Sequence, residues 1–346
     1  MSIFPGKILL LIYFIGFFFF SCKKEEIKMG IWNSFISKNN ITNYPFQDHI
    51  TDNYVKAFET HKKLSQHHLR NNEWEFLGPD NVAGRILSLA INPKDTNALW
   101  AGSSSAGLWY SESGGRGQKA WKNISLGFPV LAISSIAIDP INPDIMYIGT
   151  GESYSYNNTD GGRHNRLMRG FWGVGILKSI DAGKTWKMSF NANAQPYLCF
   201  WKIVVNPNNT KIIYAAGTHG IYKSSDEGET WKLILNKKMS CELVMHPNIP
   251  EILIAGVGGL GGDDFGIFMS QDGGSLWKKI TDGEIPNGQG RIMITINKKF
   301  PQKVFALISD SFKTKSLIRT NNLFTDFAIS SIVNVSSYQG WYAKGM

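Results

Sequence analysis

The sequence KSIDAGKTWKM at residues 178–188 returns twice, as KSSDEGETWKL at 223–233 and as MSQDGGSLWKK at 269–279. The three copies start 45 and then 46 residues apart, so the chain repeats a unit of nearly constant length. Each copy places Asp, Gly and Trp at fixed offsets between two apolar segments, a pattern typical of a hairpin turn between β-strands. A repeat of this length predicts one supersecondary unit that stacks against its neighbours.

The other half of the unit is a second predicted hairpin. In RILSLAINPKDTNALWAG at 85–102, an alternating apolar segment leads through an Asn-Pro turn to a second apolar segment that ends in Gly. Four short strands in about 45 residues are typical of a β-propeller blade. The sequence therefore predicts an all-β propeller of four-stranded blades in an incomplete ring. About five blades are expected, near residues 83–123, 131–190, 198–236, 240–282 and 289–329.

The repeated motif is interpreted as a structural turn and not as an active site. Asp accepts hydrogen bonds from its own turn, Gly supplies a positive φ, and Trp is expected to cover the turn and pack against the next blade. An aspartate that occurs three times is also a poor basis for one catalytic centre. The predicted turn residues are Asp181, Gly183, Trp186, Asp226, Gly228, Trp231, Asp272, Gly274 and Trp277.

The composition argues against a nucleic-acid partner. The net charge of +9 comes largely from lysine pairs at expected strand ends, such as Lys237-Lys238, where a solvated edge is the simpler interpretation. No nucleic-acid-binding motif accompanies them. Two cysteines in consecutive repeats, Cys199 and Cys241, allow either a disulfide between blades or two buried thiols.

The N-terminus predicts export. Lys7 precedes an apolar run at 8–20, which is too short for a membrane span and suits a signal peptide. Cys22 follows the run and resembles the lipidated cysteine of bacterial lipoproteins; the alternative is a plain signal peptide with an incidental cysteine. We therefore expect a lipoprotein of the bacterial cell envelope, most simply at the outer membrane and exposed at the surface, that contacts the membrane only through its lipid.

The expected organisation is a signal peptide at 1–22, a polar tether at 23–73 with a short helix within 52–70, and the partial propeller at 74–346. His61, His67 and His68 have a spacing that suits metal binding, but an exposed helix face is the preferred interpretation. We predict no metal and no cofactor. Residues 331–346 look like the start of a further blade, so the chain is interpreted as truncated, with self-association as an alternative way to complete the ring.

The candidate site lies on the face opposite the Asp turns, where the loops after the second strands gather. Two of these loops are long, at 152–173 and 257–266. The carboxylates considered for glycosidic chemistry are Glu152, Asp263 and Asp264, although an Asp pair in a Gly-rich loop is commonly a turn or a weak cation site. The candidate ligand-binding residues are Arg85, Tyr154, Tyr156, Arg163, His164, Arg166, Trp172, His219 and Arg291. Solvated loop positions are the alternative for His164 and His219, and pairing with neighbouring carbonyls is the alternative for the arginines at 85 and 291.

Over residues 74–346 the chain resembles proteins with Asp-box (bacterial neuraminidase) repeats, which include sialidases, sortilin-type receptors and xyloglucanase-type glycoside hydrolases. The likeness is carried by EFLGPDNVAGRI at 75–86, YIGTGE at 147–152 and GILKSIDAGKTW at 175–186. The resemblance implies a structural role for the Asp turns. It places a xyloglucanase catalytic Asp where this chain reads GSSSAGLW at 102–109, without a carboxylate. We therefore predict a propeller that binds a glycan or a polypeptide; the alternatives are a glycoside hydrolase and an assembly factor for an envelope complex.

Overall fold

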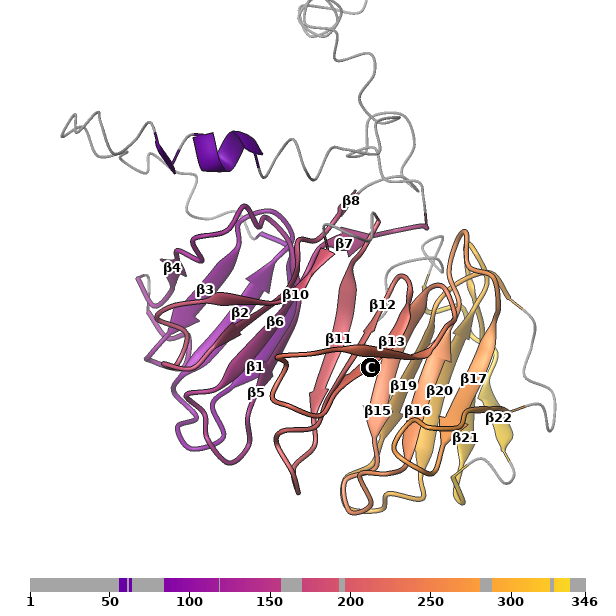
Figure 1. Ribbon diagram of the computed structural model, residues 1–346. Coiled ribbons are helices and arrows are strands. Elements are labelled where there is room, and N and C mark those ends of the chain that lie inside the picture. The colour runs from indigo at the N-terminus through magenta and orange to yellow at the C-terminus, as the bar shows by residue number, and fades with distance from the viewer. Residues whose placement is uncertain are drawn as a thin grey trace, which may run out of the picture. The chain divides into compact units, whose positions relative to one another are not determined.

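The computed structural model describes residues 56–60, 62–63, 84–117, 119–156, 170–192, 197–280, 288–323 and 327–336. Residues 84–336, within these limits, form five four-stranded antiparallel sheets and one two-stranded sheet (Figure 1). The only helical residues in the described part of the chain outside single turns are 56–60 and 62–63, which lie within the predicted tether helix. The predicted all-β propeller of five four-stranded blades is confirmed, with boundaries close to those expected.

The strands follow the chain order within each blade. Blade one contains β1 (Ile86–Ile91), β2 (Leu99–Ser103), β3 (Leu108–Ser111) and β4 (Lys122–Ile124). Blade two contains β5 (Ile133–Ile138), β6 (Met146–Thr150), β9 (Gly175–Ser179) and β10 (Lys187–Asn191). Blade three contains β11 (Phe200–Val205), β12 (Ile213–Gly217), β13 (Gly220–Ser224) and β14 (Lys232–Leu235). Blade four contains β15 (Ser240–Met245), β16 (Leu253–Val257), β17 (Gly266–Ser270) and β18 (Lys278–Lys279). Blade five contains β19 (Ile292–Ile296), β20 (Val304–Ser309), β21 (Thr314–Thr320) and β22 (Ala328–Ser331), while β7 (Glu152–Ser153) and β8 (Gly170–Phe171) pair outside the blades.

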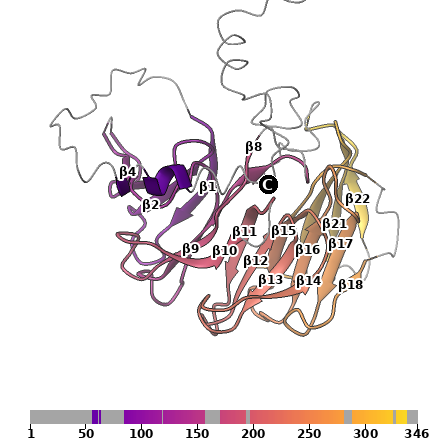
Figure 2. The same ribbon diagram turned by 45° about the horizontal axis from the view of Figure 1, so that its top comes forward.

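The hydrophobic core lies between blades and not within them. Four clusters of buried side chains occupy the interfaces between blades one and two, two and three, three and four, and four and five. The first strands β1, β5, β11, β15 and β19 each contact the next one in this order, and Figure 2 shows the blades succeeding one another in the same way. A single blade therefore leaves both apolar faces open, and burial comes from stacking.

Glycine at the end of the second strand permits this stacking. A Cβ on Gly149 would lie 2.8 Å from the carbonyl oxygen of Phe200, and one on Gly256 would lie 2.6 Å from that of Ile292. Both carbonyls belong to the first strand of the following blade. Serines of the first strands add hydrogen bonds across the same interface, because Ser88 Oγ donates to Ile133 O at 3.0 Å. The Gly in the second strands of the first four blades is thus required by the neighbouring backbone.

The Asp turns have the geometry expected of structural elements. Asp226 accepts hydrogen bonds from Thr230 N at 2.9 Å, Thr230 Oγ1 at 2.6 Å and Ser224 Oγ at 2.7 Å. Bonds from Thr230 and Ser224 lower the pKa of Asp226 to about 2. Gly228 has φ 82°, which a residue with a side chain rarely adopts. The turn at Asp181 repeats this arrangement, and all three aspartates are satisfied by their own turns.

The Asp turns pack against the preceding blade. The prediction that their Trp side chains pack against the next blade is therefore wrong. Trp231 Nε1 donates to Ser189 Oγ of blade two at 3.2 Å, and Tyr147 OH of blade two donates to Glu227 O at 3.0 Å. Tyr214 OH donates to Gly273 O in the same way, also at 3.0 Å. Tyr147 of β6 and Tyr214 of β12 therefore each support the turn of the following blade.

Both cysteines in the described part of the chain are buried thiols that form no disulfide. Cys241 Sγ donates to Gly258 O at 3.0 Å, and burial raises the pKa of this thiol to about 11. Of the two alternatives, buried thiols are correct. Cys22 and the histidines at 61, 67 and 68 lie outside the described residues. No helix among the described residues has the length and hydropathy needed to cross a membrane.

The ends of the blade series expose apolar side chains. Leu89 and Ile91 of β1 are 61% and 53% exposed, and Val333 and Val335 after β22 are 66% and 67% exposed. Equivalent side chains in the inner blades lie in the interface clusters. These observations are compatible with an incomplete ring, which stays a prediction.

The third Asp turn tests the contribution of the threonine. Leu276 occupies the position of Thr in the other two turns, so Asp272 lacks the hydrogen bond that the Thr hydroxyl donates there. The Leu276 side chain is 75% exposed. We expect Leu276→Thr to raise the Tm by about 1–3 °C, because it adds one hydrogen bond to a charged acceptor. Leu276→Val is the control, since it matches the shape of Thr without the hydroxyl. Equal Tm changes in the two variants would contradict this role of the threonine.

Candidate functional site

The candidate site lies on the face where the first strands begin and the second strands end, here called the loop face. The two long loops predicted from the sequence meet on it. Ser155 forms a parallel β-bridge with Leu260, and Tyr156 N donates to Leu260 O at 2.8 Å. The loops of blades two and four are therefore in direct contact on the loop face. The sequence pattern identified each loop but contained no sign of their contact.

Glu152 and Arg85 form a bidentate ion pair at this face. Arg85 Nη1 lies 2.5 Å from Glu152 Oε1, and Arg85 Nη2 lies 2.7 Å from Glu152 Oε2. Arg85 Nη1 also donates to Tyr154 OH at 2.7 Å. The Glu152 side chain is 2% exposed, and one guanidinium binds both of its oxygens. This arrangement suits a positioning or binding role better than that of a general acid.

Arg291 reaches the same region from the start of blade five. Its Nη2 donates to Ser153 O at 2.5 Å, and its Cζ lies 4.7 Å from the centroid of the Trp201 ring. Arg291 is 7% exposed, so its charge is held against an aromatic face with little access to water. Of the predicted ligand-binding residues, Arg85, Tyr154 and Arg291 are thus brought together around the segment that contains Glu152.

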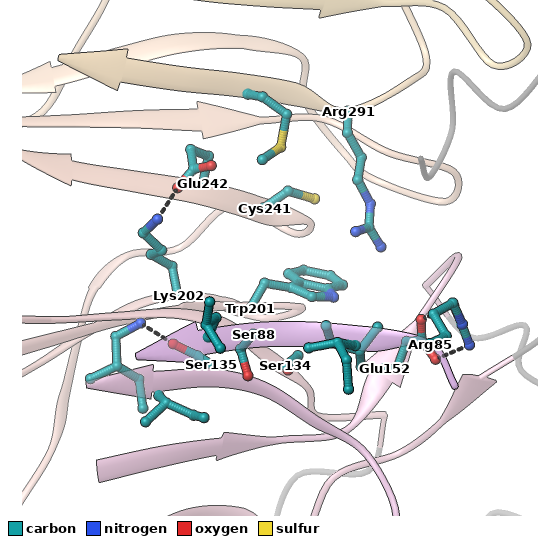
Figure 3. A pocket seen from close by; sticks show the side chains of 16 residues that line it. Arg85, Ser88, Ser134, Ser135, Glu152, Trp201, Lys202, Cys241, Glu242 and Arg291 are labelled. Atoms are coloured by element: carbon teal, nitrogen blue, oxygen red, sulfur yellow. Dashed lines mark hydrogen bonds and ion pairs between the residues drawn. The ribbon is translucent and has the colours of Figure 1, made fainter. Parts of the chain in front are cut away.

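Arg85, Glu152 and Arg291 line a cavity of about 530 Å³ that runs along the first strands and is here called the axial cavity. All five blades contribute to its lining, as Figure 3 shows from close by. Lys202 Nζ lies 3.3 Å from Glu242 Oε1 inside it. Burial raises the pKa of Glu242, whose side chain is 4% exposed, although Lys202 opposes the shift. Lys202, Glu242 and Trp201 were not identified from the sequence, because the first strands carry no motif that marks the inward positions.

A second group of side chains on the loop face is aromatic. Ring centroids lie 5.0 Å apart for Trp172 and Tyr197, 5.4 Å for Tyr156 and His219, and 6.3 Å for Tyr156 and Tyr197. Lys238 Nζ lies 4.6 Å from the Tyr156 ring centroid. We call Tyr156, Trp172, Tyr197 and His219 the aromatic cluster. Three of the four were predicted, and Tyr197 was missed because it lies outside the long loops.

Burial lowers the pKa of His219, and the nearby Lys238 adds to this effect, so the ring is neutral at pH 7. Its Nδ1 lies 3.1 Å from Thr218 Oγ1. Within the cluster, the histidine therefore acts as an uncharged polar ring next to three larger aromatic rings. Of the described side chains, no group of three or more His, Cys, Asp or Glu is arranged to hold a metal ion.

Asp263 and Asp264 lie at a different cavity, of about 420 Å³, formed with the glycine-rich loop of blade four. Asp264 lies 2.8 Å from Lys237 Nζ and 2.6 Å from Lys279 Nζ. Partial burial opposes ionisation, but the hydrogen bonds from both lysines outweigh it and lower the pKa of Asp264 to about 2. Glu152 lines the axial cavity instead, so the three candidate carboxylates are divided between two cavities. Arg163, His164 and Arg166 lie outside the described residues.

No protein-family model matches the chain. A segment of 68 residues is 40% identical to the oligoxyloglucan-reducing end-specific xyloglucanase of Emericella nidulans, covering 18% of this chain and 8% of that enzyme. Among solved structures, the chain is similar to an ancestral GH74 enzyme, with a TM-score of 0.56 at 18% identity over 73% of this chain. The GH74 enzyme of Niastella koreensis (TM-score 0.53, 18% identity, 70% of this chain) and the GH74 xyloglucanase of Xanthomonas campestris (TM-score 0.51, 16% identity, 70% of this chain) are also similar.

At these identities the structural likeness concerns the fold. The chain spans 34%, 38% and 38% of the lengths of the three GH74 structures, so it corresponds to about a third of each. The neighbours are glycoside hydrolases with propeller folds, in agreement with the xyloglucanase-type part of the resemblance found in the sequence.

The ion pair of Glu152 should contribute to stability. We expect Glu152→Gln to lower the free energy of unfolding by about 2 kcal/mol, since a charge-assisted bidentate pair is replaced by weaker bonds. Arg85 is 44% exposed on its side chain, so water limits the cost. The matched control is Glu112→Gln, which breaks an exposed ion pair with Lys122 and should change stability by less than about 0.5 kcal/mol. Urea unfolding measures both; equal effects would contradict a stabilising role for Glu152.

Proposed function

We propose that this chain is a propeller of a glycoside hydrolase that acts on a polysaccharide of the xyloglucan class, and that its aromatic cluster binds the sugar chain. The aromatic cluster is the observation on which the proposal depends. Aromatic side chains offer rigid apolar faces with polar edges, which suit the alternating apolar and hydroxyl surfaces of sugar rings. The local identity to a xyloglucanase supports this choice of polysaccharide.

Hydrolysis needs two carboxyl groups roughly 5–10 Å apart. On the described loop face, Glu152 is paired with Arg85 and Asp264 with two lysines. The segment at 102–109 also lacks a carboxylate. This observation favours a second candidate function, in which the chain binds the polysaccharide without cleaving it. The two candidates share the binding surface and differ in the release of reducing ends.

The binding surface is tested by affinity electrophoresis of the full chain in gels that contain xyloglucan. We expect Trp172→Ala and Tyr197→Ala to weaken retention by about 5–10-fold, because each removes a face for a sugar ring. Phe300→Ala is the control, since Phe300 is 44% exposed in the turn between β19 and β20, on the opposite face. If xyloglucan retained both cluster variants as strongly as the wild type, the proposed binding surface would be wrong.

Reducing-end release from the same xyloglucan separates the candidates. Release by the wild type that Glu152→Gln abolishes, at a pH where the variant remains folded, supports hydrolysis. Retention without release supports binding alone. Neither retention nor release would reject both.

We further propose that the protein is exported and anchored through Cys22. The support is the apolar run at 8–20 followed by a cysteine and charged residues. Labelling cells with a radioactive fatty acid should mark the wild type and not Cys22→Ala. Equal labelling of both proteins, or none of the wild type, would contradict lipidation at this position.

A further inference from the structure

The axial cavity has the size and lining of a small-molecule site that the proposed glycan surface does not use. Its volume of about 530 Å³ lies within the range of ligand-binding pockets. The aromatic cluster does not line it. The lining combines serine hydroxyls with aliphatic side chains such as Leu87 and Met293, so the cavity can accept a ligand with both polar and apolar surface.

The charged side chains in the lining favour an anion. Three are cationic, Arg85, Lys202 and Arg291, and two are carboxylates, Glu152 and Glu242, which leaves one positive charge in excess. Glu242 is nearly fully buried, and burial shifts it toward the neutral form, which would increase the excess. A monoanion would balance the charge of the cavity.

Two hydrogen-bond donors in the lining are available to such a ligand. Trp201 Nε1 is buried and has no acceptor among the described residues. A buried donor without an acceptor is costly, and a ligand oxygen would remove the cost. Ser135 Oγ accepts a hydrogen bond from Ile203 N at 2.8 Å, which leaves its hydroxyl hydrogen for another acceptor.

Arg291 and Trp201 extend into the cavity from opposite sides (Figure 3). The guanidinium carbon lies 4.7 Å from the indole centroid, so the two groups are in direct contact. A carboxylate has two acceptor oxygens and can take a hydrogen bond from each of two donors that are this close. Arg291 is 7% exposed, so the charge interaction takes place with little screening by water.

We propose that the axial cavity binds a small organic monocarboxylate of monosaccharide size, such as a uronic acid, with the carboxylate between Arg291 and Trp201 Nε1. The excess positive charge selects the acid over a neutral sugar. The serine hydroxyls and aliphatic side chains of the first strands contact the rest of the ligand. This site is separate from the aromatic cluster and does not depend on the proposed function.

The proposal is tested by titration calorimetry of the full chain with glucuronate, glucose and inorganic phosphate. Glucuronate is expected to bind at least about tenfold more tightly than glucose, since only the acid meets the excess charge. Trp201→Phe keeps a ring for Arg291 to stack on and removes the N–H, and it should weaken glucuronate binding by about 5–10-fold. Arg291→Gln should weaken it further.

The controls separate this site from the glycan surface. Trp172→Ala should leave glucuronate binding unchanged, and Trp201→Phe should leave retention by xyloglucan unchanged. If Arg291→Gln does not fold, the glucuronate affinity of Trp201→Phe still tests the proposed site. Three results would overturn the proposal: no binding of glucuronate, equal binding of glucose, or binding of phosphate as tight as that of glucuronate. Unchanged glucuronate affinity in Trp201→Phe would also overturn it.

Discussion

The close contact between consecutive blades is the constraint on which the rest of this structure depends. Among the described residues, the clusters of buried side chains lie at the blade interfaces, and none lies within a single blade. Two features of the repeat make the contact possible. Gly149 and Gly256 leave room for the carbonyl oxygens of the next first strand, and Tyr147 and Tyr214 support the turn of the following blade. The repeated residues are therefore explained by stacking and not by catalysis.

Stacking also determines where function can arise. Because the first strands lie side by side, residues at equivalent positions in different blades gather around one cavity. Trp201 of blade three and Arg291 of blade five come into contact in this way, and Glu152 at the end of a second strand meets Arg85 of blade one. The Asp turns, on the opposite face, are occupied by their own hydrogen bonds. The fold thus uses one face for stability, and the proposed ligand sites lie on the other.

Two of the candidate carboxylates of the loop face, Glu152 and Asp264, are held by cations. Arg85 binds both oxygens of Glu152, and two lysines bind Asp264 and lower its pKa to about 2. A general acid must deliver a proton from one of its carboxyl oxygens, and both oxygens of Glu152 are already bound by Arg85. The aromatic cluster and the axial cavity instead offer surfaces for recognition.

The sequence by itself determined the fold class, the five blades and the role of the Asp turns, because a repeat of about 45 residues with fixed turn chemistry is a local property of the chain. It also indicated most of the loop-face residues, since long loops interrupt the repeat. Only the tertiary structure decided which of them meet. Arg291 and Ser153 are 138 residues apart, and Tyr156 reaches Leu260 of another blade. The inward direction of Trp201, the placement of Glu152 and Asp264 at different cavities, and the packing of the Asp turns on the preceding blade follow from how the blades stack, which no local pattern encodes.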